Sequence, residues 1–402
     1  MAALPRSAVV LYERGDVTAA FVDKGDDFAR TFLDSGTYGF IPGFPSAYTQ
    51  PLYGFFLVPV YWLFERSWVT VGIAHALVAV ATAWLVYEIG RRVLSPLAGL
   101  LAGALASLHP YLVWHDVHMN REILDGALAA AVVLLALVVV DRRSAWLGAL
   151  LGAVMGVAIL GNVRLLLLPL VVGAWLLWRG RRAALVPAAL AVAAAALVVT
   201  PWVVRNRVSV GCVALTTDGR ALWKANNVDT LETLRSGRWI DDVPPIPGTP
   251  PTPQDAGAIY EETGRIVRTD ECAQMRFYRA RALEFVRDHP GEKAELALLS
   301  AQMLWQPAVT KTEGRPGAGT WLDTARDWVE PAFMVVLYGL GLFGAFVVPR
   351  RFVVLAATLL AYQTVMAMAF AGETRYRAPW DFLIAVAASG GALRLWERFA
   401  PR

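Results

Sequence analysis

Apolar residues run along this chain in long, nearly uncharged blocks that are rich in Ala, Leu and Val. About nine such blocks can be distinguished, at residues 68–87, 97–114, 123–140, 145–161, 165–178, 183–202, 332–348, 352–371 and 380–393. A helix of about 20 apolar residues spans the roughly 30 Å hydrocarbon core of a bilayer, whereas barrel strands alternate apolar and polar positions over about ten residues. The sequence shows blocks and not alternation, so it predicts an all-α polytopic membrane protein.

Composition supports this prediction. Of the 402 residues, 56% are hydrophobic and only 17% are charged, well below the roughly 25% charged residues of a soluble domain. These values exclude a soluble globular enzyme, a disordered chain and a fibrous repeat. The net charge of +4 is explained by arginines in loops, so nucleic acid is not expected as a partner.

The distribution of arginine predicts the orientation in the membrane. Twelve arginines lie in alternate loops or in the C-terminal tail: Arg91, Arg92, Arg142, Arg143, Arg179, Arg181, Arg182, Arg350, Arg351, Arg394, Arg398 and Arg402. The intervening short loops hold only Arg121, Arg164, Arg375 and Arg377. Because positively charged loops stay in the cytoplasm, the second set should face outward, together with residues 1–51 and 203–331.

This orientation divides the chain into four regions. Residues 1–67 are predicted to form an extracytoplasmic loop with juxtamembrane helices, and residues 68–202 a transmembrane module. Residues 203–331 form an extracytoplasmic loop domain and residues 332–402 the last transmembrane helices. The apolar segment 52–64 is short and contains Pro59, so we interpret it as an interfacial or partly inserted helix. As a full span it would instead place residues 1–51 in the cytoplasm.

The long outer loop has recognisable segments. Val208–Thr217 is strand-like, residues 255–286 favour a helix, and residues 292–305 are amphipathic. Cys212 and Cys272 both lie in this loop, which faces an oxidising compartment. Two interpretations stay open for them, a disulfide or two unpaired buried thiols.

Charged residues of the outer segments gather at the ends of the predicted spans. Four clusters are present: residues 16–30 with Asp16, Asp23, Asp26, Asp27 and Arg30; residues 115–122 with His115, Asp116, His118, Arg121 and Glu122; Arg205–Arg207; and Glu373–Arg377. Arginines near helix ends also reach lipid phosphates in any membrane protein, and acidic loop residues are often only solvated. Four clusters at one rim suit an enzyme that acts on an anionic lipid headgroup.

Several motifs resemble those of a known family. They are Phe28–Gly36, Pro45-Ser46-Ala47-Tyr48, Leu108-His109-Pro110, Glu122-Ile123-Leu124, Pro201–Asn206 and Arg375-Tyr376-Arg377-Ala378-Pro379. In this order, the chain resembles the GT-C glycosyltransferases that use polyprenyl-phosphate sugars, and within them the bacterial protein mannosyltransferase-like and lipid A aminoarabinose transferase-like proteins. The family has a transmembrane helix before the first outer loop. In this sequence either the start is truncated or that helix is missing.

The resemblance implies a membrane glycosyltransferase of the bacterial inner membrane with an active site on the extracytoplasmic side. It would transfer a sugar, with inversion, from a polyprenyl-phosphate donor to a glycan, lipid or protein acceptor. An outer-loop aspartate, Asp26 or Asp27, would be the general base, although the family spacing also allows Asp16 or Asp23. Glu122 would be a second catalytic carboxylate.

The leaving phosphate requires cations in such a mechanism. The predicted ligands of the lipid phosphate are Arg205, Asn206, Arg375, Tyr376 and Arg377, because guanidinium groups match phosphate oxygens. A divalent metal, Mg²⁺ or Mn²⁺, could also neutralise the phosphate, with His115, Asp116 and His118 as candidate ligands. The alternative for the two histidines is hydrogen bonding at the membrane interface.

A lipid or glycan transporter, or a flippase, is the main rival class. It would require ionisable residues near the middle of the bilayer and broken helices in paired halves. In this sequence only His75, Asp125 and Asp381 lie within or near the predicted spans, and no internal repeat is present.

Overall fold

The computed structural model describes residues 1–12, 22–307 and 321–399, and the regular elements within these ranges are helices. The first half contains α1 (Ala3–Tyr12), α2 (Gly25–Ser35), α3 (Pro51–Phe64), α4 (Trp68–Val93), α5 (Pro96–Ser107), α6 (Pro110–His115), α7 (Glu122–Arg142), α8 (Ala145–Gly161), α9 (Leu168–Gly180) and α10 (Leu185–Ser209). The second half contains α11 (Gly219–Lys224), α12 (Val228–Arg235), α13 (Pro253–Thr263), α14 (Glu271–Asp288), α15 (Pro290–Trp305), α16 (Trp321–Gly344), α17 (Arg350–Ala369), α18 (Thr374–Arg377) and α19 (Phe382–Phe399).

The predicted all-α class is confirmed, and each of the nine apolar blocks forms helix. Four helical segments of the described residues are long and apolar enough to cross a membrane: Trp68–Val93, Glu122–Arg142, Val163–Ser209 and Arg350–Ala369. Three apolar helices are shorter: Pro51–Phe64, Pro96–Ser107 and Ala145–Gly161. The block 97–114 is divided between α5 and α6 at His109-Pro110, because proline disfavours a helical conformation in the residue before it.

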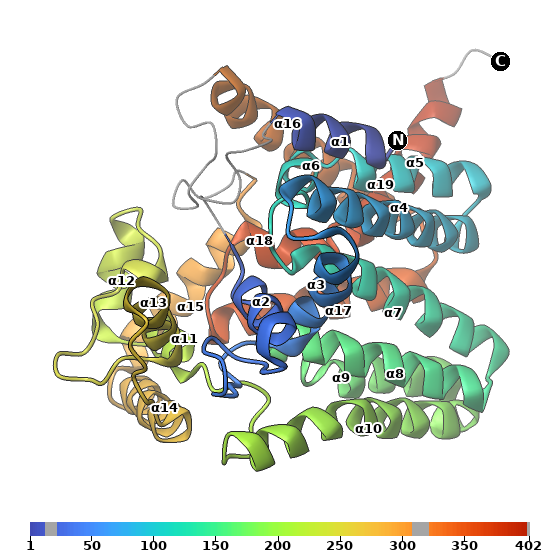
Figure 1. Ribbon diagram of the computed structural model, residues 1–402. Coiled ribbons are helices and arrows are strands. Elements are labelled where there is room, and N and C mark those ends of the chain that lie inside the picture. Colours follow the sequence, from blue (N-terminus) through green and yellow to red (C-terminus); the bar gives the residue numbers. More distant parts are fainter. Residues whose placement is uncertain (13–21, 308–320, 400–402) are drawn as a thin grey trace.

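The bundle is closely packed where glycine lines a helix face. A side-chain carbon at Gly148 or Gly152 of α8 would collide with backbone atoms of Pro187 and Ala191 in α10. Small residues therefore let the two backbones approach closely, as is common between membrane helices. Figure 1 shows α8 and α10 side by side, with α7 above them.

The predicted strand at Val208–Thr217 is wrong. Helix α10 continues to Ser209, the chain then turns at Gly211 with a φ of 100°, and residues 212–218 form a loop. The Nδ2 group of Asn206 donates to the carbonyl of Ala214 at 2.9 Å. The β-branched residues of this segment have no strand to pair with in the described part of the chain, and Val208 and Val213 are exposed.

A disulfide joins Cys212 to Cys272, which are 60 residues apart in sequence. It ties the chain after α10 to the first turn of α14. Closing a loop of this length stabilises a fold by about 4 kcal/mol in the chain-entropy model. The bond thereby holds the outer helices against the end of the bundle.

The outer helices gather beyond one end of the bundle. Figure 1 shows α11–α14 grouped there, with α2 lying between this group and the apolar helices. Helix α15, predicted as an amphipathic segment, packs against α17 and α18. The first outer loop, the outer helices and α18 therefore enclose one region at the mouth of the bundle.

Candidate active site

The first outer loop and the start of α7 are joined at the mouth of the bundle. Val22 forms a parallel bridge with Met119, and the backbone N–H of Asp23 donates to the carbonyl of Met119 at 2.8 Å. The Asp23 carboxylate accepts from the N–H of Gly25 at 2.8 Å. These bonds hold Asp23 beside the segment that carries Arg121 and Glu122.

Three carboxylates lie where the first outer loop meets the start of α7, those of Asp23, Glu122 and Asp125. Burial raises the pKa of Asp23 above its ordinary value, and the charge of Glu122 adds to this effect, while Arg121 and Lys24 act in the opposite direction. Glu122 is buried and lies 3.8 Å from Nε2 of His115. Asp125, one turn further along α7, accepts from Nδ2 of Asn162 at 2.8 Å.

Three arginines from separate segments surround the same place. Arg121 donates to Oε1 of Gln50 at 2.5 Å. The Arg164 guanidinium lies 3.7 Å from the ring centroid of Tyr376 and donates to the carbonyl of Ala371 at 3.0 Å. Arg375 pairs with Glu373 at 2.9 Å and donates to the hydroxyl of Tyr376 at 2.8 Å.

The arginines repel one another. The charges of Arg121 and Arg375 both act on Arg164 as neighbouring like charges. Within the ranges that the structure describes, neither Arg121 nor Arg164 has a carboxylate partner within 4.0 Å. An anion bound among them would offset this repulsion, since guanidinium forks match the oxygens of phosphate.

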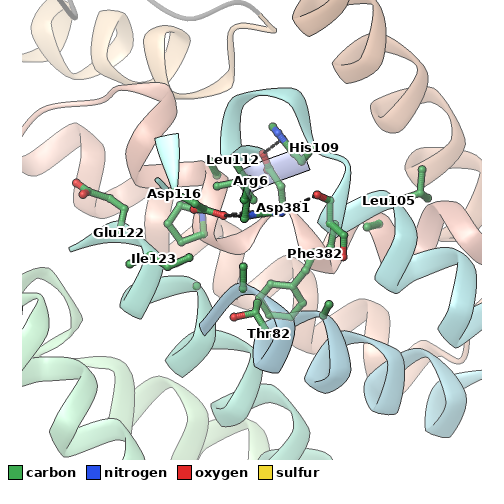
Figure 2. A pocket seen from close by; sticks show the side chains of 18 of the residues that line it. Arg6, Thr82, Leu105, His109, Leu112, Asp116, Glu122, Ile123, Asp381 and Phe382 are labelled. Atoms are coloured by element: carbon green, nitrogen blue, oxygen red, sulfur yellow. Dashed lines mark hydrogen bonds and ion pairs between the residues drawn. The ribbon is translucent and has the colours of Figure 1, made fainter. Parts of the chain in front are cut away.

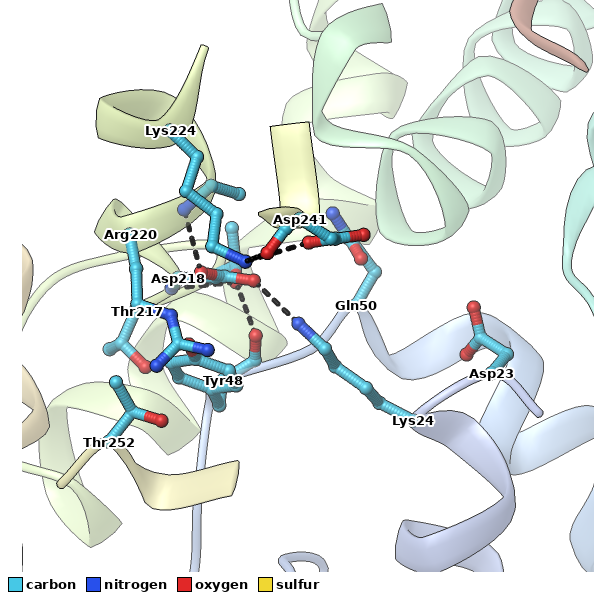
Figure 3. Close-up of polar contacts among 12 residues, drawn as sticks. Asp23, Lys24, Tyr48, Gln50, Thr217, Asp218, Arg220, Lys224, Asp241 and Thr252 are labelled. Atoms are coloured by element: carbon cyan, nitrogen blue, oxygen red, sulfur yellow. Dashed lines mark hydrogen bonds and ion pairs between the residues drawn. The ribbon is translucent and has the colours of Figure 1, made fainter. Parts of the chain in front are cut away.

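The outer helices close over the arginines through a second set of charges. Lys24 pairs with Asp218 at 2.7 Å, and Lys224 pairs with Asp241 at 2.9 Å. Burial raises the pKa of Asp241, but Lys224, Arg375 and Lys24 outweigh it and lower that pKa overall. Figure 3 shows Asp23 and Lys24 of the first outer loop on one side and Asp218, Lys224 and Asp241 of the outer region on the other.

Known proteins share this architecture. Residues 47–204 match the sequence model of the dolichyl-phosphate-mannose-protein mannosyltransferase family. The oligosaccharyltransferase of Archaeoglobus fulgidus, solved with a tethered acceptor peptide, has a TM-score of 0.55 at 10% identity, covering 99% of this chain and 49% of that one. Solved with an inhibitory peptide and a dolichol-phosphate, it has a TM-score of 0.55 at 12% identity, covering 99% of this chain and 50% of that one.

The chain has the GT-C fold. The predicted resemblance is thereby confirmed. ArnT from Cupriavidus metallidurans, bound to undecaprenyl phosphate, has a TM-score of 0.44 at 18% identity, covering 96% of this chain and 76% of that one. The chain spans about half the length of the archaeal oligosaccharyltransferase. No curated protein sequence matches it.

Of the three candidate base residues that the structure describes in the first outer loop, only Asp23 lies next to Glu122. Asp26 is 1% exposed, and its carboxylate accepts from Tyr61 at 2.5 Å and from two nitrogens of Arg66 at 2.9 Å. Asp27 lies on α2 and pairs with Arg30 at 2.5 Å. Asp16 lies outside the described residues.

The predicted phosphate ligands separate into two groups. Arg375 and Tyr376 lie in the arginine cluster, whereas Arg205 donates to the carbonyls of Tyr38 and Ser46 and Asn206 to that of Ala214. Arg377 is fully buried, pairs with Asp381 at 3.0 Å and donates to the carbonyls of Leu304 and Gln306. These three side chains hold loops in place.

The residues predicted as metal ligands have separate partners. Asp116 accepts two bonds from Arg6, at 2.9 and 2.5 Å. Nδ1 of His118 lies 2.7 Å from the carbonyl of Trp114, while His115 stacks on Tyr111. Among the described residues no group of three or more His, Cys, Asp or Glu side chains could hold a metal ion. The predicted ligands His115, Asp116 and His118 are thus not gathered into one metal site within the described part of the chain.

A small cavity lies behind the site. It has a volume of about 40 Å³, which is room for about three water molecules and too little for a sugar. Figure 2 shows Arg6, His109, Asp116, Glu122 and Asp381 around it. The arginine cluster lies outside the residues that line this cavity.

Two functional candidates were missed by the sequence motifs. Arg164 was used only as a marker of orientation, and Arg121 was placed in the charge cluster 115–122 without a role of its own. A signal was present, because each lies at the end of a predicted span, where a charge is costly unless it is paired. Their convergence with Tyr376 could not be foreseen, since the segments are far apart in sequence.

Proposed function

We propose that this protein is a membrane glycosyltransferase that moves a sugar from a polyprenyl-phosphate donor to an extracytoplasmic acceptor. The observation that carries the proposal is the cluster of Arg121, Arg164 and Arg375 beside Asp23 and Glu122. Arg121 and Arg164 have no carboxylate oxygen within 4.0 Å among the described residues. The dolichol-phosphate in the archaeal oligosaccharyltransferase structure supports a lipid phosphate as the anion.

Asp23 is the general base in this proposal. Its carboxylate takes the proton from an acceptor hydroxyl or amine as the acceptor atom bonds to the anomeric carbon of the donor sugar. The bond from that carbon to the phosphate oxygen breaks with its electron pair, so the polyprenyl phosphate leaves and the configuration inverts. Glu122 lies close to His115 and Arg121. It binds a polar group of the acceptor other than the attacking hydroxyl or amine.

The arginines stabilise the departing phosphate. Charge grows on the phosphate oxygen as the bond breaks, and donors already aimed at it lower the barrier without reorganisation. Tyr376 fixes two of them, because Arg164 stacks on its ring and Arg375 donates to its hydroxyl. Orientation of donor and acceptor at this one place supplies a further part of the rate.

The membrane assignment follows the arginine distribution. The mouth of the bundle, with Asp23 and Glu122, would face the extracytoplasmic side of a bacterial inner membrane, and the donor tail would lie among the apolar helices. Labelling of single cysteines placed in residues 22–30 by a membrane-impermeant reagent tests this. Labelling from the cytoplasmic side alone would contradict the proposed orientation.

The function is tested directly with purified protein in lipid nanodiscs. A panel of polyprenyl-phosphate sugars is supplied with membrane glycolipid and peptide acceptors, and release of polyprenyl phosphate is measured with transfer of the sugar. We expect transfer from at least one donor, with inversion at the anomeric carbon. Movement of donor lipid across a bilayer without any transfer would instead support the flippase.

The rate should depend on pH through Asp23. Because burial raises the pKa of Asp23, we expect kcat/KM to fall on acidification at a higher pH than for an ordinary aspartate. Lys24 lowers that pKa, so Lys24→Met should move the acidic limb of the kcat/KM profile further toward higher pH. Lys224→Met, which removes the partner of Asp241, should leave the limb in place. An unmoved limb in Lys24→Met would exclude Asp23 as the titrating base.

A further inference from the structure

A second, larger hollow lies outside the arginine cluster. It has a volume of about 590 Å³ and runs between residues 40–46 of the first outer loop and residues 209–211, 253–256 and 267–276 of the outer region. Sites for small ligands commonly measure about 300–1,000 Å³. The groove is thus large enough for two or three sugar rings.

Aromatic side chains form one wall of the groove. Phe40 packs edge-on against Phe28, with ring centroids 4.7 Å apart, and lies against Gly257 of α13. Phe44 is partly exposed, and the guanidinium of Arg268 lies 6.0 Å from its ring centroid. Aromatic rings that are fixed in position, as these two are, can stack on the apolar faces of sugar rings.

Two arginines and two carboxylates line the groove, and the carboxylates are engaged by donors other than these arginines. Asp270 accepts from the N–H of Ala273 at 2.8 Å, where it caps α14. Glu271 is buried and accepts from the N–H of Ala47 at 3.0 Å and from Thr217 at 2.6 Å. Arg268 and Arg276 are exposed, and within the described ranges neither has a carboxylate within 4.0 Å.

The groove is connected to the arginine cluster by one stretch of chain. Phe40 and Phe44 line the groove, and a few residues later Gln50 accepts from Arg121. Arg205 fixes the stretch by donating to the carbonyls of Tyr38 and Ser46. The Cys212–Cys272 disulfide lies in the opposite wall. Residues 40–50 therefore link one wall of the groove to the arginine cluster.

We propose that this groove binds the carboxylate-bearing part of an acidic glycan acceptor. The acceptor role rests on the proposed function, whereas the binding itself can be measured without catalysis. Phe40 and Phe44 would stack on sugar rings, and Arg268 and Arg276 would pair with carboxylates through charge-assisted hydrogen bonds.

The test is the binding of trigalacturonate to the full chain in detergent, with maltotriose as the neutral probe of similar size. Wild type should bind trigalacturonate at least tenfold more tightly than maltotriose. Arg268→Ala and Arg276→Ala should each weaken trigalacturonate binding about tenfold, and Phe44→Ala should weaken both probes. Arg281→Ala is the matched control, because Arg281 is an exposed arginine of the same helix that pairs with Glu284 outside the groove; it should bind as wild type does.

Equal affinity for the two probes, or equal loss in Arg281→Ala and Arg276→Ala, would overturn the proposal. Sugar transfer by wild type without trigalacturonate binding would overturn the proposed role of the groove and leave the proposed function standing. Trigalacturonate binding that depends on Arg268 and Arg276 in a chain without transferase activity would support the groove and overturn the proposed function.

Discussion

Replacing Asp23 with asparagine is expected to lower kcat by about 10²–10⁴-fold, the usual contribution of a general base. Asparagine keeps the side-chain oxygen that accepts from the N–H of Gly25, so the turn before α2 should persist. Donor binding, measured as protection against heat by the polyprenyl-phosphate sugar, should be nearly unchanged. The measurement is single-turnover transfer with donor bound in advance, which isolates the chemical step.

Two neighbouring substitutions separate chemistry from stability. Asp34→Asn is the matched control, because Asp34 is an exposed residue near the end of α2, the helix that also carries Asp26. This variant should keep full activity and stability. Asp26→Asn should lower thermal stability, since it weakens the buried contacts with Arg66 and Tyr61. Normal transfer in Asp23→Asn, together with loss in a stable Asp26→Asn protein, would return the role of base to Asp26.

Arg164 and Arg377 should respond in opposite ways to removal of their charge. Arg164→Gln is expected to lower kcat by about 10²–10³-fold, as for the loss of one preorganised donor to a developing negative charge. Its stability without ligand should change little, because relief of the burial cost and of the repulsion from Arg121 and Arg375 offsets the lost contacts of Arg164 with Tyr376 and Ala371. Arg377→Gln should instead destabilise the fold by about 3–5 kcal/mol, since it leaves Asp381 as a buried charge without this partner.

The two variants are compared by thermal unfolding with and without polyprenyl phosphate. Polyprenyl phosphate should raise the unfolding temperature of wild type and of Arg377→Gln, whereas it should raise that of Arg164→Gln only slightly. Gln363→Leu is a suitable control, because Gln363 is a buried polar residue of α17 outside the arginine cluster. If polyprenyl phosphate raises the unfolding temperature of Arg164→Gln as much as that of wild type, Arg164 does not bind the phosphate.

The separation of Arg375 from Arg377 shows where sequence motifs stop being informative. The two residues are neighbours in one motif, yet Arg375 lies beside Tyr376 in the cluster and Arg377 is enclosed by Asp381 and backbone carbonyls. They lie on different sides of the short helix α18 and therefore meet different parts of the fold. The motif predicted phosphate ligands, but the packing of α15 against α18 decides which arginine is available.

Sequence alone determined the membrane class, the nine helical blocks, the outer clusters of charge and the resemblance to GT-C enzymes. These properties follow from hydrophobic blocks and local residue order, which act over one or two helical turns. It missed the loop at Val208–Thr217, because β-branched residues favour strands only when a partner strand is available. It also could not choose among four aspartates of the first loop.

Only the tertiary structure decided which charges meet. The bridge between Val22 and Met119 places Asp23 beside Glu122 and turns Asp26 toward Arg66. Arg164 reaches the carbonyl of Ala371 across 207 residues of sequence. Electrostatic interactions depend on distance in space and on burial, not on separation along the chain. The charged residues were therefore visible in the sequence, while the fold decides which of them lie together.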